Sequence, residues 1–218
     1  MISVIIPTLN DERTLVPTLA ALVPAVVDGI VQEAILSDGG SSDDTRIIAD
    51  AAGVQLIDAP RGRAAQLKAG AALARGDWLL FLPAGTALEP GWAEEVHGFI
   101  ERVQSGRRRQ AAAFFSFALD DDGFMPRLFE RLVQLRGLML AMPHGDQGML
   151  ISRKHYERLR SVRRRPKRSE IVMLKSRGVT NGERYQRDGY FAGGLRNTGL
   201  ALLNFLSAPA RALSRLYS

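Results

Sequence analysis

Oxygen-bearing side chains suited to holding a polar ligand occupy two short segments near the start of the chain. The first segment, PTLND, contains Thr8, Asn10 and Asp11, and the second, SDGG, contains Asp38 followed by Gly39. A carboxylate at position 38 can accept hydrogen bonds from the N–H of a nucleobase or from ribose hydroxyls, and the glycines after it allow a ligand to approach the backbone closely. The chemistry that these residue types favour is the binding of a nucleotide.

Each segment directly follows an aliphatic, β-branched run, and this order predicts how the two segments are positioned. SVII at 3–6 precedes the first segment, and AIL at 34–36 precedes the second. Buried parallel strands deliver such loops to the carboxyl edge of a sheet, so we expect the two loops side by side. Taken alone, the first loop also fits an ordinary turn with a helix cap, because Asn and Asp favour both.

A third cluster of residues is basic and suits phosphate. Arg61, Arg63, Gln66 and Lys68 open a predicted helix, and the start of a helix supplies unpaired N–H groups and the positive end of the helix dipole. The arginines add fixed charge, so this segment is expected to bind a diphosphate. The alternative is a solvated basic helix face, which is the commoner place for an arginine on a helix.

Hydrophobic runs and turn residues alternate along the chain and predict one α/β domain with a mostly parallel central sheet flanked by helices. The expected strands lie near residues 2–6, 33–37, 54–58, 78–82, 112–118 and 148–152. One helix is expected to begin near Ser42, with Ser41 or Ser42 as its cap, and another to span the Ala-rich segment that ends at Gly76. After about residue 153 the pattern weakens, and residues 161–169 are expected to form a mobile basic loop.

The composition fits a single cytoplasmic domain. A chain of 218 residues, of which 46% are hydrophobic, can bury one large core. The sequence contains no cysteine, which excludes a disulfide framework, a zinc–thiolate site and a cysteine nucleophile. Met1 leads straight into a core strand, so no signal peptide is expected. The formal net charge of +6 predicts an anionic partner.

Several of these segments together carry a family resemblance. PTLND, SDGGSSDDT, RGRAAQLKAGAALARGDWLLFL and PHGDQGMLISR resemble successive blocks of the family 2 glycosyltransferases, which have a GT-A fold. They are most similar to the bacterial branch labelled as arsenosugar-biosynthesis glycosyltransferases, and the basic and then apolar end of the chain resembles that branch too. The order and spacing of the blocks are more specific for the fold than for a substrate.

The resemblance implies a Rossmann-like GT-A domain over residues 1–190 and an amphipathic helical tail over residues 191–218. It also implies transfer of a sugar, with inversion, from a UDP- or GDP-linked donor to an acceptor hydroxyl. The residues that would hold the nucleotide sugar are Pro7, Thr8, Asn10, Asp11, Asp38, Gly39, Arg63, Gln66, Lys68 and Gly85. Asp38 is the strongest of these candidates, because the matching acid in the family binds the base or the ribose.

The family's metal-binding motif is altered in this chain. Relatives place an aspartate at the end of the fourth strand to hold Mg²⁺ or Mn²⁺ against the donor diphosphate, and here LPAGT has Gly85 at that position. Hard cations need oxygen ligands, and this segment offers only the Thr86 hydroxyl and backbone carbonyls, so we assign no metal ligand. One hypothesis is that Lys68, which replaces the family's usual asparagine, joins Arg63 in stabilising the leaving diphosphate. The other is that sugar transfer was lost together with the metal ligand.

An inverting transfer also needs a carboxylate that deprotonates the acceptor hydroxyl. Relatives carry a Glu-Asp pair on a helix, and the matching stretch of this chain, RRRPKRSEIVMLKSRG, contains only Glu170. Asp146, in HGDQG, is the better-placed candidate for the catalytic base. Asp146 and Gln147 equally fit a role in binding the acceptor, and Asp146 also fits a simple turn cap.

Two other classes of function remain open at the level of sequence. A GT-A pseudoenzyme, which binds a nucleotide or acts as a scaffold, would account for Gly85 and for the missing acidic pair. The intact first and second loops favour retained donor binding. A nucleotidyltransferase is disfavoured, because PTLNDERT contains no glycine and such enzymes have a glycine-rich phosphate loop after the first strand.

The end of the chain and one basic run indicate candidate partner surfaces. The apolar run LALLNFL, with Arg196, Arg211 and Arg215 around it, is far shorter than the roughly 20 residues that span a bilayer. It fits an interfacial helix on the inner face of the membrane, or a helix docked on the domain or on a second subunit of a homo-oligomer. The run from Arg163 to Arg168 fits anionic lipid, an anionic acceptor or solvent, and no nucleic-acid partner is expected, because the sequence has no nucleic-acid recognition motif.

Overall fold

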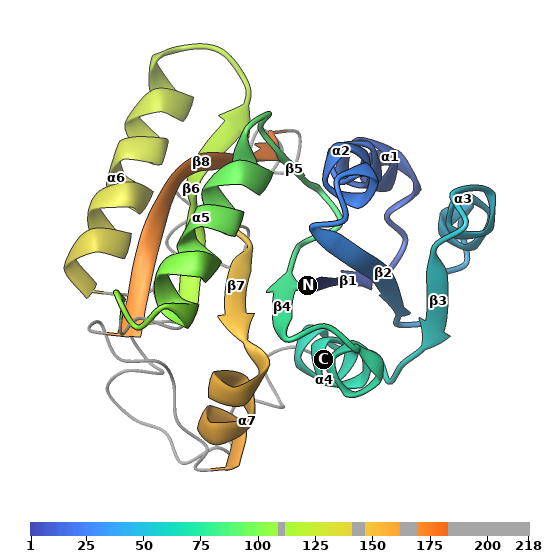
Figure 1. The fold of residues 1–218 in the computed structure, drawn as a ribbon. Coiled ribbons are helices and arrows are strands. Elements are labelled where there is room, and N and C mark those ends of the chain that lie inside the picture. Colours follow the sequence, from blue (N-terminus) through green and yellow to red (C-terminus); the bar gives the residue numbers. More distant parts are fainter. Residues whose placement is uncertain (109–111, 141–146, 162–169, 183–218) are drawn as a thin grey trace.

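The computed structural model of the protein describes residues 1–108, 112–140, 147–161 and 170–182 (Figure 1). The helices are α1 (Glu12–Ala20), α2 (Val23–Val27), α3 (Thr45–Ala51), α4 (Arg63–Leu73), α5 (Trp92–Gln104), α6 (Phe124–Leu140) and α7 (Arg153–Ser161). The strands are β1 (Ile2–Thr8), β2 (Val31–Asp38), β3 (Gln55–Asp58), β4 (Trp78–Phe81), β5 (Thr86–Leu88), β6 (Ala112–Asp120), β7 (Met149–Ser152) and β8 (Ile171–Asn181). All six strands expected from the hydrophobic pattern are present.

Within the described ranges, eight strands form one mixed sheet in the order β3-β2-β1-β4-β7-β6-β8-β5. The first four strands in this order are parallel to one another. β7 runs antiparallel to both β4 and β6, β6 is parallel to β8, and β5 is antiparallel to β8. Thr8 of β1 is in register with Asp38 of β2, so the two strands leave the sheet at the same level. The predicted α/β domain is confirmed, and the predicted binding loops do start side by side.

Helices cover both faces of the sheet, and the alternation of side chains along β1 shows how the layers are built. Ile2, Val4 and Ile6 are fully buried in a core shared with α1, α2, α3 and α5. Ile5 points to the other face, where α4 and α7 pack (Figure 1). Phe117 of β6 belongs to a smaller cluster with α6. Burial of one such side chain stabilises the fold by about 1.5–3 kcal/mol, so both layers hold β1 in place.

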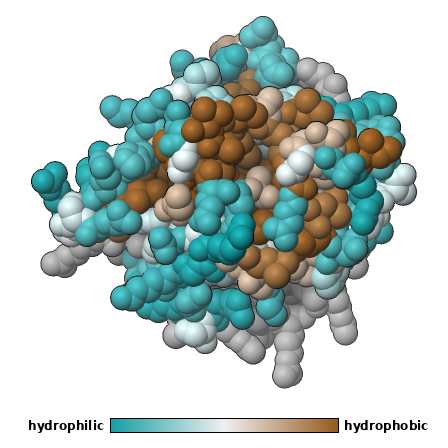
Figure 2. Space-filling model, turned by 45° about the vertical axis from the view of Figure 1, so that its right-hand side comes forward, coloured by the Kyte–Doolittle hydropathy of each residue, from teal (hydrophilic) through white to brown (hydrophobic). Residues whose placement is uncertain are grey.

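The outer side of α1 and α2 is apolar as well. Residues 14–27 contain no charged side chain, and Val16, Val23, Val26 and Val27 are exposed. Figure 2 shows apolar surface gathered on one face of the molecule, with hydrophilic side chains around it. In the part of the chain that the structure describes, no helix is both long and apolar enough to cross a bilayer.

Two strands were not predicted from the sequence. β5 has only three residues, which is too short for an alternating pattern to be visible. β8 begins with the apolar residues IVML and continues with KSRGVTN, in which Lys175 and Arg177 are exposed. A basic run precedes β8, and the second half of β8 is polar. No clear strand pattern is therefore visible in the sequence here.

Two helix boundaries also differ from the prediction. α3 begins at Thr45 and not near Ser42, because the residues before Thr45 are hydrogen-bonded to the neighbouring loop. α4 ends at Leu73, before Gly76 is reached. Of the basic loop predicted over residues 161–169, Ser161 is instead the last residue of α7, and residues 162–169, before Glu170, lie outside the described residues. The tail over residues 191–218 also lies outside the described residues.

Gly70 lets α4 pack directly against the strands that carry the two loops. A Cβ atom at this position would overlap Cγ2 of Ile5 and would lie 2.6 Å from Oγ of Ser37. Both neighbours are completely buried and cannot move aside. The absence of a side chain at Gly70 therefore sets the distance between α4 and the sheet.

We predict that Gly70→Ala lowers the free energy of unfolding by about 1–3 kcal/mol, the usual cost of overpacking a core. The matched control is Gly98→Ala in α5, where a Cβ would meet only the end of the flexible Arg102 side chain, at 3.3 Å. Alanine is intrinsically the better helix former by about 0.5–1 kcal/mol, so the control is expected to be neutral or stabilising. Urea unfolding measures both variants, and equal stability of the two would contradict the packing described above.

Candidate functional site

A cleft of about 810 Å³ opens at the carboxyl ends of β1 and β4. This volume lies in the range of about 300–1,000 Å³ that is typical of small-molecule sites. Its walls come from the loop after β1, the first turn of α1, the loop after β2, the start of α4, the β4–β5 connection and the end of β8. Of the residues predicted to hold a nucleotide, the wall contains Pro7, Thr8, Asn10, Asp11, Arg63, Gln66 and Gly85.

The loops after β1 and β2 are joined by reciprocal hydrogen bonds. The backbone N–H of Asn10 donates to Oγ of Ser41 at 2.9 Å, and the N–H of Ser42 donates back to Oδ1 of Asn10 at 2.9 Å. Asn10 has a φ of 57°, a left-handed conformation that asparagine tolerates better than most residues. The N–H of Asp11 donates to Oγ1 of Thr45 at 2.9 Å. Each loop therefore satisfies backbone groups of the other.

A second reciprocal pair uses carboxylates of the same two loops. The N–H of Glu12 donates to Oδ2 of Asp43 at 3.0 Å, and the N–H of Asp44 donates to Oε2 of Glu12 at 3.0 Å. Asp43 also accepts the N–H of Thr45, at 3.1 Å, through its other oxygen. These contacts link the start of α1 to the start of α3, so the two loops form one unit.

The carboxylate of Asp38 lies at the centre of this unit and is completely buried. It accepts hydrogen bonds from the hydroxyl and the N–H of Ser41, from the N–H of Gly40 at 3.3 Å and from Oγ1 of Thr8 at 3.3 Å. Nη1 of Arg46 lies 3.1 Å from Oδ2. Burial alone would raise the pKa of Asp38, but the hydrogen bonds from Ser41, Thr8 and Gly40 outweigh it and lower the pKa. Asp38 is thus placed behind the cleft wall, where it holds both loops.

Gln66 fixes the sheet edge from the opposite side. It is buried, and its Nε2 donates to the backbone carbonyl of Thr8 at 2.7 Å and to that of Ser37 at 2.9 Å. The N–H of Gly39 also donates to the Thr8 carbonyl, at 2.9 Å, and a Cβ at Gly39 would lie 3.0 Å from Nε2 of Gln66. Gly39 and Gln66, both predicted to contact the nucleotide, therefore hold the ends of β1 and β2 together, and Gln66 also lines the cleft.

The cleft contains charged side chains of both signs. Oδ2 of Asp11 accepts the N–H of Leu9 at 2.8 Å. Burial, together with the nearby charges of Asp43 and Asp38, raises the pKa of Asp11, whereas the Leu9 hydrogen bond and Arg63 oppose the rise. A carboxyl group in a cleft whose pKa is raised by burial and by neighbouring carboxylates is typical of a binding or catalytic site.

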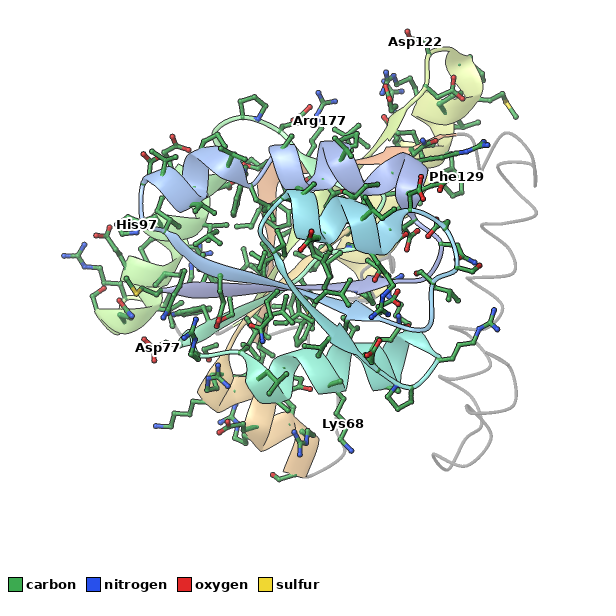
Figure 3. The ribbon with its side chains drawn as sticks, turned by 90° about the vertical axis from the view of Figure 1, so that its right-hand side faces the viewer. Lys68, Asp77, His97, Asp122, Phe129 and Arg177 are labelled. Atoms are coloured by element: carbon green, nitrogen blue, oxygen red, sulfur yellow. The ribbon has the colours of Figure 1, made fainter. Side chains whose placement is uncertain are left out.

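Lys68 does not reach the cleft. It follows the buried Gln66 by two residues on α4, which places it on the opposite side of that helix, and its side chain is exposed. Figure 3 shows it pointing away from the sheet. The hypothesis that Lys68 stabilises the leaving diphosphate required an inward side chain, so this geometry does not support it.

Glu170 lies at the other edge of the sheet. Its carboxylate is 4.0 Å from Nε2 of His155 on α7, and α7 begins where the N–H of Arg153 donates to the carbonyl of Asp77, just before β4. The cleft is at the far end of β4, and β8 runs between Glu170 and the cleft for its whole length, roughly 30 Å. Glu170 is therefore too remote to act as a general base in this cleft.

The other two predicted chemical residues are Gln147 and Asp146. Gln147 is completely buried, and its Nε2 donates to the backbone carbonyl of Phe115 at 3.1 Å. This contact gives Gln147 a part in joining β7 to β6. Asp146 lies outside the described residues, so its assignment stays a prediction.

Comparison with known proteins decides the family. The model of glycosyl transferase family 2 matches residues 3–160, which is most of the chain. The protein belongs to glycosyl transferase family 2. The glucosyl-3-phosphoglycerate synthase of Mycobacterium tuberculosis H37Rv is 45% identical over 56 residues, covering 26% of this chain and 17% of that protein. The PGL/p-HBAD biosynthesis glycosyltransferase of Mycobacterium bovis BCG is 40% identical over 101 residues, covering 40% of this chain and 36% of that protein. The chain thus spans well under half the length of these relatives.

Solved structures confirm the GT-A-like fold of this family 2 chain. The crystal structure of Mycobacterium tuberculosis glucosyl-3-phosphoglycerate synthase in complex with Mn²⁺, UDP-glucose and phosphoglyceric acid matches with a TM-score of 0.55 and 20% identity. The match covers 91% of this chain and 80% of that one. A second structure, of a mycobacterial protein, has a TM-score of 0.56 at 19% identity and covers 91% and 75%. At such identities the likeness concerns the fold alone.

Among the described residues, those around Gly85 do not form a metal site of side-chain ligands. A Cβ at Gly85 would lie 3.6 Å from Cβ and Oγ1 of Thr14, an ordinary contact, so a side chain would fit there although none is present. The neighbouring hydroxyls of Thr86 and Thr180 are neutral and lie 3.3 Å from each other. In residues 1–108, 112–140, 147–161 and 170–182, no three acidic, histidine or cysteine side chains gather as metal ligands. The described residues of the cleft wall therefore do not fit a divalent cation held by side chains.

Several residues of the cleft wall were not singled out from the sequence, among them Arg13, Thr14, Thr180 and Asn181. Arg13 and Thr14 belong to the first turn of α1, and their signal was their position two and three residues after Asp11. Thr180 and Asn181 come from the end of β8, where the N–H of Asn181 donates to the carbonyl of Gly85 at 3.1 Å. These two could not be found, because β8 itself was not predicted.

We predict that Asp38→Asn lowers the free energy of unfolding by about 2–4 kcal/mol at pH 7, because the amide turns an N–H group toward buried donors. The lowered pKa of Asp38 means that its stabilisation is present above the unfolded-state pKa and is lost as the pH falls through the folded-state pKa. The gap between the wild type and Asp38→Asn should therefore be full at neutral pH and shrink in acid.

The control for this prediction is Asp58→Asn. Asp58 contacts the same Arg46, at 2.7 Å, but its side chain is 80% exposed. Exposed ion pairs contribute at most about 1 kcal/mol, so this variant is expected to unfold nearly as the wild type does. Chemical denaturation across a pH series measures both, and a small or pH-independent effect of Asp38→Asn would contradict the central role of its carboxylate.

Proposed function

We propose that the protein binds a nucleotide-diphosphate sugar in this cleft and transfers the sugar, with inversion, to the hydroxyl of an acceptor. The observation that carries the proposal is the cleft at the carboxyl ends of β1 and β4, walled by two interlocked loops in a chain of glycosyl transferase family 2. Ligands of open α/β sheets bind at this edge. The mycobacterial synthase of similar fold was crystallised with UDP-glucose.

The loop unit supplies the nucleoside end of the proposed site. Thr8, Asn10 and Asp11 line the cleft, and among their groups are the Asn10 amide and the Asp11 carboxylate. These groups can hold a base and a ribose by hydrogen bonds, and the loops need little rearrangement because they are already fixed to each other. Arg63, at the start of α4, is placed to meet the diphosphate, where guanidinium and phosphate pair well.

The proposed chemistry follows from the leaving group. The acceptor oxygen attacks the anomeric carbon from the face opposite the diphosphate, the bond between that carbon and the diphosphate oxygen breaks, and a carboxylate takes the acceptor proton. Asp146 is the proposed base, because the segment that contains it, HGDQG, resembles a block of the family 2 sequences. Gln147, next to it, is proposed to help bind the acceptor, and its side chain is held to β6 through the Phe115 carbonyl.

A second candidate function is nucleotide binding without transfer. Gly85 removes the carboxylate expected of a catalytic family member, and Glu170 is remote from the cleft. Both observations fit a protein that keeps the donor site as a sensor or scaffold. The two functions share the same first step and differ in turnover.

Two further parts of the proposal come from the sequence. The donor is proposed to be linked to UDP or to GDP. A cytoplasmic location, with the tail over 191–218 on the inner face of a membrane, is proposed from the basic and apolar character of that segment. Docking of the tail on a second subunit is the alternative.

Calorimetric titration with uridine, UDP, GDP and their sugars tests the donor site. We expect saturable binding of at least one nucleotide, weakened about tenfold or more by Asp11→Asn, because a ligand hydrogen bond to a charged carboxylate is lost. Asp58→Asn, outside the cleft, should bind as the wild type does. No binding of any nucleotide would overturn the proposal.

Turnover separates the two candidate functions. A transfer assay with the donor that binds, followed by NMR of the anomeric signal, should show a product of inverted configuration. Tight donor binding with neither transfer nor donor hydrolysis would favour the binding protein, and a product of retained configuration would contradict the mechanism.

A further inference from the structure

The cleft must balance the two negative charges of a diphosphate, and its own residues suggest how. We propose that the donor diphosphate is bound without a divalent cation, and that the guanidinium groups of Arg13 and Arg63 supply the positive charge. This inference rests on the proposed nucleotide binding and adds to it the means of charge neutralisation. It departs from the metal dependence that the family resemblance implies.

The carboxylates of the cleft accept hydrogen bonds within the loop unit. Glu12 accepts the N–H of Asp44, and Asp43 accepts the N–H groups of Glu12 and Thr45. Asp11 accepts the N–H of Leu9. These hydrogen bonds hold the carboxylates within the two loops, and among the described residues no three acidic, histidine or cysteine side chains gather as metal ligands.

The wall around position 85 is where the metal ligand of relatives would stand. The described groups there are Gly85, the hydroxyls of Thr14, Thr86 and Thr180, and the side chain of Asn181. They are all neutral. A Mg²⁺ or Mn²⁺ ion with only such ligands and phosphate oxygens would be held by the nucleotide and hardly by the protein.

Two arginines give the described part of the cleft wall its positive charge. Among the described residues that line the cleft, the positively charged ones are Arg13 and Arg63. Arg13 lies in the first turn of α1, beside Thr14, which is the residue nearest to Gly85. Arg63 is the first residue of α4. Both side chains are exposed in the open cleft, so both can reach a ligand without first leaving a buried position.

The two arginines also sit where the backbone favours an anion. α1 and α4 both begin at the cleft, and the positive end of each helix dipole favours a bound anion there. Two guanidinium groups match the formal charge of the diphosphate bridge, and each can pair with two phosphate oxygens at once. The combination provides the electrostatic stabilisation of a leaving diphosphate that a metal provides elsewhere.

The test is calorimetry with UDP and with uridine, each in EDTA and in Mn²⁺, on the wild type and on Arg13→Gln, Arg63→Gln and the double variant. We expect the wild-type affinity for UDP to change less than about twofold between EDTA and Mn²⁺. Each single variant should lose about tenfold or more in UDP affinity and little in uridine affinity, because uridine has no phosphate. Lys154→Gln, an exposed cation on α7, is the control for net charge and should behave as the wild type.

Restoring the acid gives the converse test. Gly85→Asp should fold, since its Cβ has only ordinary contacts, and its UDP affinity should become about tenfold higher in Mn²⁺ than in EDTA. A Gly85→Asp protein indifferent to Mn²⁺ would overturn the placement of the diphosphate at this wall.

Other outcomes are equally decisive. Wild-type UDP binding that requires Mn²⁺, or arginine variants that weaken uridine as much as UDP, would overturn the inference while leaving nucleotide binding intact. Failure of the wild type to bind either uridine or UDP in any buffer would instead overturn the proposed function, and the inference with it.

Discussion

The buried carboxylate of Asp38 is the contact on which the candidate site depends. It sits at the end of β2, in register with Thr8 of β1, and gathers hydrogen bonds from Thr8, Gly40 and Ser41 together with the guanidinium of Arg46. A buried charge is costly unless its partners are complete, and here they come from both loops. Displacement of either loop would remove hydrogen-bond donors from this charge. The loops are therefore held in one arrangement before a ligand arrives.

The sheet makes this arrangement possible. Parallel pairing of β2, β1 and β4 brings three carboxyl ends to one edge, and Gln66 joins two of them through the Thr8 and Ser37 carbonyls. Gly70 allows α4 to pack against β1 and β2, which sets the position of Gln66 and Arg63 on the same helix. A cleft built in this way is fixed at the two loops, the proposed nucleoside end, and is also lined by neutral hydroxyls and by arginines.

Local patterns in the sequence predicted much of this architecture. The aliphatic runs before PTLND and SDGG were visible without any structure, because strand periodicity and loop polarity are local properties. The direction in which a side chain points depends on how distant parts of the chain pack, so a local pattern does not show it. Asp38 and Lys68 were both predicted to face the ligand, yet one is buried behind the loops and the other points to solvent (Figure 3). Only the packing of α4 and the pairing of the loops decides these orientations.

The elements that the sequence concealed are those whose stability comes from distant partners. β8 alternates polar and apolar residues weakly and is held by β6 and β5, which lie far from it in the chain. Its end nevertheless supplies Thr180 and Asn181 to the cleft. The same dependence explains why Glu170, close in sequence to the expected catalytic pair, lies at the opposite edge of the sheet: the strand that follows it carries the chain across the whole domain.

The central claim is that the two loops tied by Asp38 act as one nucleotide-binding unit. Amide hydrogen exchange, recorded residue by residue with and without saturating UDP in EDTA, tests it most directly. The account predicts that the exchange of the amides of Asn10, Asp11, Glu12, Ser42 and Asp44 slows together on addition of UDP, since the ligand stabilises both loops as one unit. Slower exchange in only one loop, or protection confined to another part of the molecule, would contradict the account.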